Sequence, residues 1–135
     1  MATLMKEHGI RIEEVSIDDL HLDPANPRRI SDAELEALTR SIRAFGLVDP
    51  IIARREGKTV IGGHQRLVAA RKLGFRTVPT VFMDLTQEES RLLNLALNKI
   101  SGDWDQELLA RMLSDLNTVD DLDVSLSGFA PDELD

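Results

Sequence analysis

Residues 60–74 of this 135-residue chain read VIGGHQRLVAARKLG, and this stretch decides the fold. Two β-branched residues lead into two adjacent glycines, after which apolar residues recur at helical spacing as far as Gly74. A strand that passes through glycines into a helix leaves the first N–H groups of the helix unpaired, and the glycines let a ligand approach the backbone. The pattern therefore predicts a strand, a tight turn and a helix that together form an anion-binding site.

Signals on both sides of this stretch predict a small mixed sheet flanked by helices. Two capping boxes, Ser31 with Glu34 and Thr86 with Glu89, begin helices, and Glu56-Gly57 predicts a β-hairpin. The expected strands are 10–17, 51–55, 58–61 and 78–84, and the expected helices are 32–45, 64–73, 87–100 and 105–117. This order predicts an α/β (α+β) domain over residues 1–117, ending in a pair of helices, and an acidic tail or linker over residues 118–135.

The composition excludes several classes of protein. The chain has no cysteine, which excludes a disulfide framework, a thiolate metal site and thiol catalysis. His8, His21 and His64 are too widely spaced for a zinc site. No apolar run approaches the roughly 20 residues that span a bilayer, and the first residues lack the apolar core of a signal peptide. We therefore expect a cytoplasmic protein without a membrane partner.

The formal net charge of −8 is distributed unevenly. Residues 103–135 hold ten acids and one base, whereas residues 40–76 hold nine bases and two acids. A basic segment of this kind either binds DNA weakly and non-specifically, opposed by the acidic tail, or forms a solvated face. The candidate DNA-binding residues are Arg40, Arg43, Arg54, Arg55, Lys58, Arg71, Lys72 and Arg76.

Four side chains are candidates for ligand binding beside the glycines. Arg66 in the first helical turn offers a bidentate phosphate donor, the alternative being a surface arginine beside a glycine turn. His64 has no serine or carboxylate close by in sequence, which favours a binding or structural role over acid–base catalysis. Asn94 and Asn98, one helical turn apart, either line a ligand's phosphates or metal or form a solvated helix face.

The ordered series of motifs resembles the ParB N-terminal domain, in the ParB/sulfiredoxin superfamily. The resemblance covers residues 15–116 and rests on NPR (26–28), LTRSIRAFGLVDPI (38–51), GGHQRLVAARKLG (62–74) and VP (78–79). It implies a ParB/sulfiredoxin-like fold that binds a nucleoside triphosphate of the CTP type with Mg²⁺, in a DNA-associated process such as partition, regulation or DNA modification.

The resemblance also implies the residues of the nucleotide site. The phosphates would lie at Gly62, Gly63, His64, Gln65 and Arg66, with Asn94 and Asn98 beside them, Asn98 at the metal, and the base and ribose would lie beside Gly46, Asp49 and Pro50. Leu97 and Ser101 stand where the family has a glutamate and an arginine. These two departures argue against efficient hydrolysis, so we expect at most a weak NTPase.

The sequence leaves the partners of the protein undecided, and it allows two alternative functions. The segment NLALNKISGDW (94–104) and the ending VSLSGF (124–129) resemble ParB-type domains of phage proteins or those ahead of DNA methyltransferases. A methyltransferase or other DNA-acting domain and a second copy of the chain are therefore candidate partners. The alternatives are a nuclease, for which no carboxylate cluster is visible in the basic region, and a free-serine-type kinase, whose loop aspartate is replaced here by Gly62 or Gly63.

Overall fold

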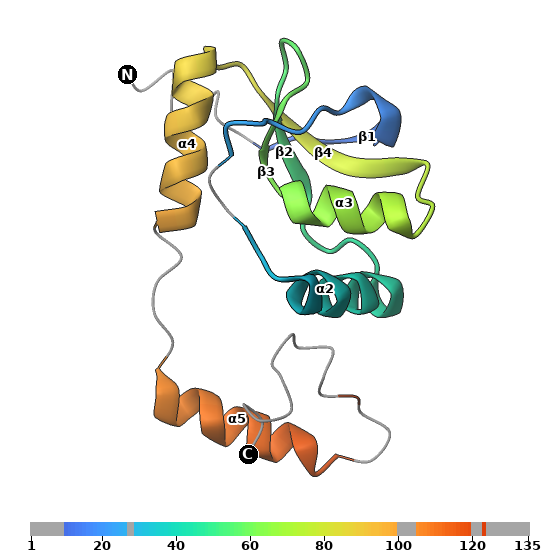
Figure 1. Ribbon diagram of the computed structural model, residues 1–135, viewed down its shortest axis with the longest axis vertical. Coiled ribbons are helices and arrows are strands. Elements are labelled where there is room, and N and C mark those ends of the chain that lie inside the picture. The colour runs from blue at the N-terminus through green and yellow to red at the C-terminus, as the bar shows by residue number, and fades with distance from the viewer. Residues whose placement is uncertain (1–9, 27–28, 100–104, 120–122, 124–135) are drawn as a thin grey trace.

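A mixed four-stranded sheet forms the centre of the computed structural model, which describes residues 10–26, 29–99, 105–119 and 123 (Figure 1). The strands are β1 (Ile12–Ser16), β2 (Ile51–Arg54), β3 (Val60–Gly62) and β4 (Thr77–Met83), in the order β1-β4-β2-β3. β2 runs parallel to β4, while β1 pairs with β4 and β2 with β3 in antiparallel fashion. The α/β (α+β) class expected from the sequence, with a small mixed sheet, is confirmed.

Within the described residues, four α-helices accompany the sheet, together with a short 3-10 turn η1 (Ile17–Asp19). They are α2 (Asp32–Phe45), α3 (His64–Lys72), α4 (Gln87–Lys99) and α5 (Gln106–Asn117). In Figure 1, α3 lies between the sheet and α2, whereas α4 stands beside the edge that β3 forms. Each helix begins and ends within a residue of its expected bounds, because capping residues and glycines mark those ends in the sequence.

The core fills the space between the sheet and α3. Leu67 and Ala70 of α3 are fully buried against the strand residues Ile51, Val60 and Val78. The helix is therefore held at a fixed position over β2 and β3, and its first residue follows directly from the end of β3 through Gly63. Packing of this kind makes the turn between β3 and α3 a rigid feature.

Two local features differ from the sequence expectation. β1 begins at Ile12, two residues later than expected, and ends at Ser16, so the buried Ile17 belongs to the turn η1 instead of the strand. The turn of the β2–β3 hairpin occupies residues 55–58 and is two residues longer than Glu56-Gly57. The reason is that Gly57 and Lys58 both adopt positive φ, 79° and 52°, so the chain reverses one position later than expected.

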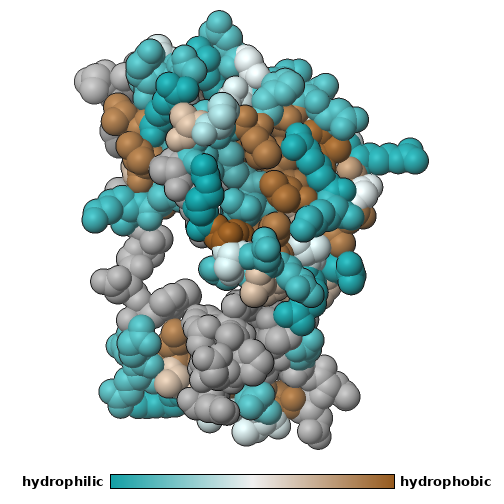
Figure 2. Space-filling view, in the orientation of Figure 1, coloured by the Kyte–Doolittle hydropathy of each residue, from teal (hydrophilic) through white to brown (hydrophobic). Residues whose placement is uncertain are grey.

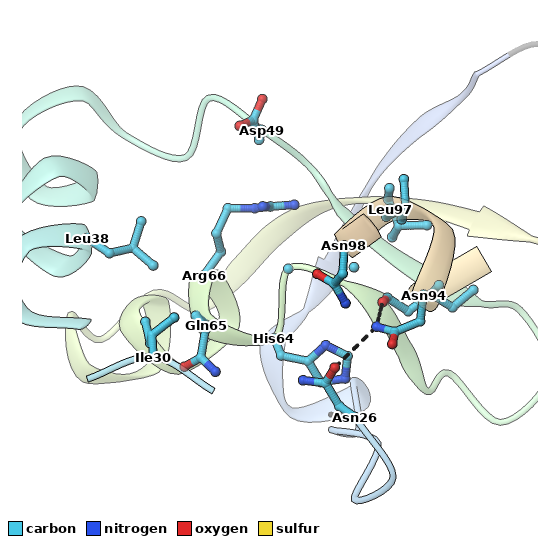
Figure 3. Close-up of a pocket in the computed structure, with 14 residues that line it drawn as sticks. Asn26, Ile30, Leu38, Asp49, His64, Gln65, Arg66, Asn94, Leu97 and Asn98 are labelled. Atoms are coloured by element: carbon cyan, nitrogen blue, oxygen red, sulfur yellow. Dashed lines mark hydrogen bonds between the residues drawn. The ribbon is translucent and has the colours of Figure 1, made fainter. Parts of the chain in front are cut away.

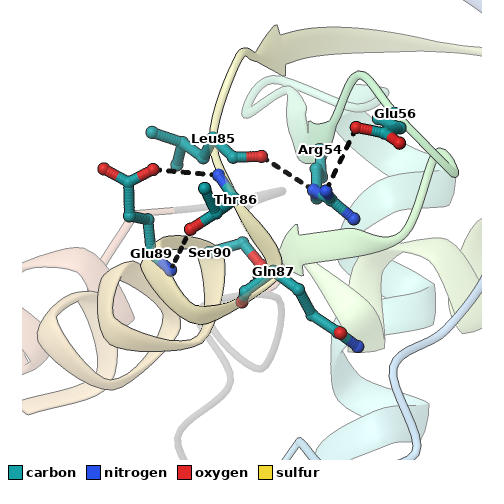
Figure 4. A network of polar contacts seen from close by, with 7 residues as sticks. All are labelled: Arg54, Glu56, Leu85, Thr86, Gln87, Glu89 and Ser90. Carbon is teal, nitrogen blue, oxygen red and sulfur yellow. Dashed lines mark hydrogen bonds and ion pairs between the residues drawn. The ribbon is translucent and has the colours of Figure 1, made fainter.

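Polar side chains fix the start of α4 against the hairpin (Figure 4). The expected capping box is present, since the Glu89 N–H donates to Thr86 Oγ1 at 3.1 Å and the Thr86 N–H donates to Glu89 Oε1 at 2.9 Å. Arg54 Nε donates to the Leu85 carbonyl at 2.7 Å, and its Nη2 pairs with Glu56 at 3.3 Å. Arg54 thus connects the end of β2 to the residue that precedes the α4 cap.

Apolar burial contributes little to the position of α4. Figure 2 shows apolar side chains exposed over this helix, where Leu92 and Leu95 are 67% and 53% exposed. Among the described residues of α4, only Ser90 is buried. Hydrogen bonds to the strands therefore matter more for this helix than for α3.

The chain after α4 is described in part. Asp105 caps the start of α5, and its carboxylate accepts the Leu108 N–H at 3.0 Å. Of the expected tail over residues 118–135, only Thr118, Val119 and Asp123 belong to the described residues, so the tail stays a prediction. Within the described segments, none of the helices combines the length and apolar character needed to cross a bilayer.

Candidate functional site

A pocket of about 350 Å³ opens where β3 runs into α3 (Figure 3). Eight of the ten residues expected to bind a ligand line it: Asp49, Gly62, Gly63, His64, Gln65, Arg66, Asn94 and Asn98. The other two, Gly46 and Pro50, lie outside the lining. The pocket thus brings together side chains from the segment before β2, the turn between β3 and α3, and α4.

Gly63 is the residue that shapes the turn. It has the left-handed φ of +95° and stands at the N-cap of α3. A Cβ built on Gly63 would lie 2.8 Å from Arg66 Nη2 and 3.0 Å from Ile51 Cδ1. No other residue fits both the conformation and the space, and the backbone N–H groups that follow border the pocket without a side-chain cap.

Arg66 does not behave as a surface arginine. Its side chain is half-buried, and Nη2 donates to the Pro50 carbonyl at 2.8 Å. The same guanidinium packs against the Cα of Gly63, as the short distances to a Cβ on that glycine show. Arg66 therefore connects α3 with the segment that leads into β2, and it borders the pocket from that position.

His64 is buried, with 8% of its surface exposed, and its Nε2 accepts a long hydrogen bond of 3.4 Å from the Asp23 N–H. Burial lowers the pKa of His64 below 6.5; Asp23 opposes this shift and Arg29 reinforces it. The neutral imidazole, with its proton on Nδ1, is the form that can accept from Asp23. His64 therefore joins the start of α3 to the loop of residues 23–26, a structural role that the sequence left as one of several.

We expect the stability of the protein to fall as the pH drops from 7.5 to 5.5, and His64 to cause part of the loss. In the unfolded chain the imidazole takes up a proton near pH 6.5, whereas the folded form resists protonation. The contribution at pH 5.5 is at most about 1.4 kcal/mol. Urea denaturation of His64→Gln, which keeps an acceptor, should show a smaller pH effect, and His21→Gln at an exposed position is measured beside it. A His64→Gln protein with the parent's full pH dependence would contradict this assignment.

Asn94 is a contact point between α4, the sheet and the loop of residues 23–26. Its Nδ2 donates to the Ile61 carbonyl at 2.7 Å and to Asn26 Oδ1 at 3.3 Å (Figure 3). Asn26 is 8% exposed and Asn94 is half-buried at the pocket, so the amide pair is partly shielded from water. Of the two alternatives for the asparagines, the solvated helix face does not apply to Asn94, and Asn98 is half-buried in the same pocket.

Carboxylates are scarce in this pocket. Asp49 is the one acid among the described lining residues. Across the described residues, no group of three or more His, Asp or Glu side chains is arranged to hold a metal ion. The protein groups present for a cation are amide oxygens and one exposed carboxylate, which fit a metal that arrives with a phosphate-bearing ligand.

The sequence model of the ParB N-terminal domain family matches residues 2–99, most of the chain. The chain belongs to this family. A probable plasmid-partitioning protein ParB of Thermus thermophilus is 43% identical over 74 residues, which are 53% of this chain and 25% of that protein. The chain spans between 25% and 39% of the length of the first three curated relatives.

Solved structures place this ParB N-terminal domain in the ParB/sulfiredoxin superfamily. The C-terminally truncated chromosome-partitioning protein ParB of Caulobacter crescentus, complexed with CTP-γ-S, superposes with a TM-score of 0.78 at 24% identity, over 92% of this chain and 74% of the other. Sulfiredoxin of Arabidopsis thaliana superposes with a TM-score of 0.52 at 25% identity, over 62% of this chain and 96% of the other. The superfamily that the motifs indicated is confirmed.

Sequence reasoning missed part of the pocket of this ParB N-terminal domain. The NPR motif marks Asn26 in the sequence, but the residues around it do not indicate that it contacts α4. The apolar part of the lining was not among the expected ligand-binding residues, and it consists of Ile30, Leu38, Ile52, Ile61 and Leu97. The Leu97 Cδ1 would lie 3.3 Å from a Cβ on Gly62, so this side chain lies against the end of β3.

The basic residues of the ParB N-terminal domain divide into two groups. Four of them already contact other residues of the protein. Arg54 donates to the Leu85 carbonyl, and Arg71 donates to the Leu20 carbonyl. Arg55 pairs with Asp84 and Glu13, and Lys58 lies 4.0 Å from Asp19. Arg43, Lys72 and Arg76 are exposed and make no such contact with the described part of the chain, and Arg40 is exposed on α2. In Figure 1 the β2–β3 turn lies at the top of the view and α2 lies at the bottom, below α3, so the eight residues do not form one surface.

Proposed function

We propose that this ParB N-terminal domain binds a nucleoside triphosphate, with CTP preferred, in a DNA-associated process. The observation that carries the proposal is the turn at Gly63, which begins α3 inside a pocket that gathers eight of the ten expected residues. The Caulobacter ParB with the same fold was crystallised with CTP-γ-S, which supports nucleotide binding by this chain.

The phosphates would lie against the first turn of α3. The backbone N–H groups after Gly63 have no partner within the helix, and the positive end of the helix dipole favours an anion. The space that a Cβ on Gly63 would take is filled by the Arg66 guanidinium and Ile51. An oxygen would therefore reach those N–H groups from the pocket, where His64 and Gln65 border the same place. The backbone supplies the donors here, which explains why the pocket needs few cations.

Mg²⁺ would enter with the triphosphate in this proposal. It prefers oxygen ligands and is commonly held by phosphates together with one or two protein groups. The Asn98 amide oxygen is the group that the pocket offers beside the phosphate end. Asp49 is the single acid of the lining, and we propose that the domain hydrolyses nucleotide weakly at most.

A nucleotide panel with product analysis tests the proposal against the nuclease and the kinase. The protein is titrated with CTP, ATP, GTP and UTP in Mg²⁺, and unfolding is measured with each. A ligand at 100 times its Kd should stabilise the fold by about 2.7 kcal/mol. Binding without cleaved DNA or a phosphorylated serine supports the proposal, and either product would favour the corresponding alternative. A protein that none of the four nucleotides stabilises would overturn it.

DNA is the second ligand that we propose, with weak and non-specific binding. Caulobacter ParB has also been crystallised with the centromeric parS site. Replacing Arg43, Lys72 and Arg76 together by glutamine should weaken binding and reduce the slope of log K against log salt by about 2 to 3, because each phosphate contact contributes about 0.9. Arg55→Gln is the matched control, since Asp84 at 3.1 Å already neutralises that charge. Fluorescence anisotropy between 50 and 200 mM salt measures the slope, and an affinity independent of salt would contradict the prediction.

The wider setting rests on resemblance alone. A DNA methyltransferase or other DNA-acting domain in the same polypeptide, a homodimer, a phage origin and a cytoplasmic location belong to the proposal. The acidic tail over residues 118–135 would compete with DNA for the basic residues, so its deletion should tighten DNA binding.

A further inference from the structure

His64 places its two ring nitrogens in different surroundings. The residue is 8% exposed, and Nε2 accepts the Asp23 N–H at 3.4 Å. Within the described part of the chain, Nδ1 makes no hydrogen bond, and it does not belong to the polar atoms that are buried without a partner. Because His64 lines the pocket, Nδ1 is the ring nitrogen that a ligand there can reach.

The hydrogen bond from Asp23 determines which nitrogen carries the proton. A neutral imidazole has one N–H donor and one acceptor, so a bond accepted at Nε2 leaves the proton on Nδ1. Burial lowers the pKa of His64, and although Asp23 opposes this shift, Arg29 reinforces it, so the ring is neutral at pH 7. His64 therefore directs an uncharged N–H donor at the pocket.

Asp23 is fixed by contacts on two sides. Its Oδ1 accepts the Ala25 N–H at 2.9 Å, and its Oδ2 lies 3.7 Å from Nε of Arg91 on α4. Three residues further on, Asn26 accepts from Asn94 of the same helix at 3.3 Å. The loop is thus held against α4, and the Asp23 N–H has a defined direction toward the imidazole.

The place of His64 in the fold suits a neutral donor better than a charged one. His64 is the first residue of α3, at the positive end of the helix, where an added cation is unfavourable in the absence of an anion. An uncharged N–H avoids this penalty and still adds a donor to the backbone N–H groups of the first turn. In Figure 3 the imidazole lies between Asn26 and Asn98, at the same end of the pocket as Asn94.

We propose that Asp23 is a positioning residue: its backbone N–H holds the proton of His64 on Nδ1, and the neutral imidazole donates this N–H to a phosphate group of the nucleotide. The inference rests on the proposed nucleotide binding and deepens it, because it assigns a role to a loop residue that does not line the pocket. A positioning residue of this kind acts through His64 alone, and the phosphates are common to all nucleotides. Its effect on affinity should therefore be the same for CTP and for GTP.

Nitrogen-15 NMR of the full chain without nucleotide tests the position of the proton. Asp23→Pro removes the donating N–H, and Asp23→Asn is the matched control, which keeps the N–H and an oxygen for Ala25 and removes only the charge. We expect Nδ1 to be protonated in the parent and in Asp23→Asn, and Asp23→Pro to show protonated Nε2 as well. A parent with its proton on Nε2, or an Asp23→Pro protein with the parent's spectrum, would overturn the inference.

Calorimetric titration with CTP and with GTP in Mg²⁺ tests the contact itself. The side-chain amide of His64→Asn lies near the place of Nδ1, whereas that of His64→Gln reaches the place of Nε2. His64→Gln should raise both Kd values about 10-fold, the loss of one hydrogen bond to a charged group, and His64→Asn should stay within about 3-fold of the parent. Asp23→Pro should raise both values about 5-fold, which corresponds to a competent tautomer fraction of about one fifth.

The pair of substitutions at His64 keeps the test decisive even where Asp23→Pro does not fold. Equal losses in His64→Asn and His64→Gln would show that a donor at Nδ1 contributes nothing, and a loss for one nucleotide alone would place His64 beside the base. Either result overturns the inference and leaves nucleotide binding intact. A parent that binds neither CTP nor GTP overturns the inference together with the proposed preference for CTP.

Discussion

Gly63→Ala should destabilise the protein by about 2–5 kcal/mol, far more than an alanine on the surface of a domain. Residue 63 has φ +95°, where an L-residue is strained by about 1–2 kcal/mol. The new Cβ would also lie 2.8 Å from Arg66 Nη2 and 3.0 Å from Ile51 Cδ1. Ile51 is fully buried and cannot retreat, so overpacking adds about 1–3 kcal/mol. Urea denaturation at constant pH measures the total.

Gly74→Ala is the control that separates strain from crowding. Gly74 follows α3 and has φ +80°, close to that of Gly63, but a Cβ there would have nothing within 4 Å. Both positions have a positive φ and only Gly63 is crowded, so this variant should lose only about 1–2 kcal/mol. Equal losses in the two variants would show that the space around Gly63 is not tight.

The nucleotide affinity of the same two variants tests whether the phosphates bind beside residue 63. Alanine at position 63 displaces the guanidinium of Arg66, which borders the pocket, so we expect nucleotide affinity to fall more than 10-fold. Alanine at position 74, beyond the other end of α3, leaves Arg66 and the pocket untouched. Full nucleotide affinity in a folded Gly63→Ala protein would place the phosphates elsewhere.

The parts of this structure that the sequence predicted are those determined by residues close together in the chain. Each of the capping boxes, Ser31 with Glu34 and Thr86 with Glu89, spans only four residues at the start of its helix. Gly63 lies between a strand and a helix whose patterns are both local, and it marks the centre of the candidate site. Local chemistry sufficed for these features because each depends on a single turn of backbone.

The parts that the sequence did not predict depend on contacts between distant residues. Asn94 meets Asn26 across 68 positions of the chain, and Arg66 meets Pro50 across 16. A polar residue in a helix carries no mark that distinguishes a solvated face from a contact with a carbonyl on another element. The apolar side of the pocket was missed for a similar reason, since Leu97 follows helical spacing whether it lies in a core or beside a ligand.

Asn94→Asp should be the second most damaging substitution, at about 2–4 kcal/mol, although the two side chains have the same shape. Asparagine donates from Nδ2 to the Ile61 carbonyl and to Asn26 Oδ1, both of them acceptors. A carboxylate at this position would offer only acceptors and would place a charge beside two oxygens that are partly shielded from water. α4 would suffer most, because apolar burial contributes little to its position. Asn117→Asp at the exposed end of α5 is the control for charge alone.

The pH dependence of the Asn94→Asp defect identifies its cause. The unfavourable site raises the pKa of the new aspartate above its unfolded value near 3.9, so the defect is complete at pH 7 and shrinks as the pH falls through the raised pKa. The protonated carboxyl group can donate to the Ile61 carbonyl as the amide did, which restores one hydrogen bond. Measuring the stability difference between parent and variant at each pH cancels the effect of His64, because both proteins carry it. A difference that stays constant from pH 7 to 4.5 would mean that the substitution disturbs packing, and that the hydrogen bonds of Asn94 do not hold α4 against β3.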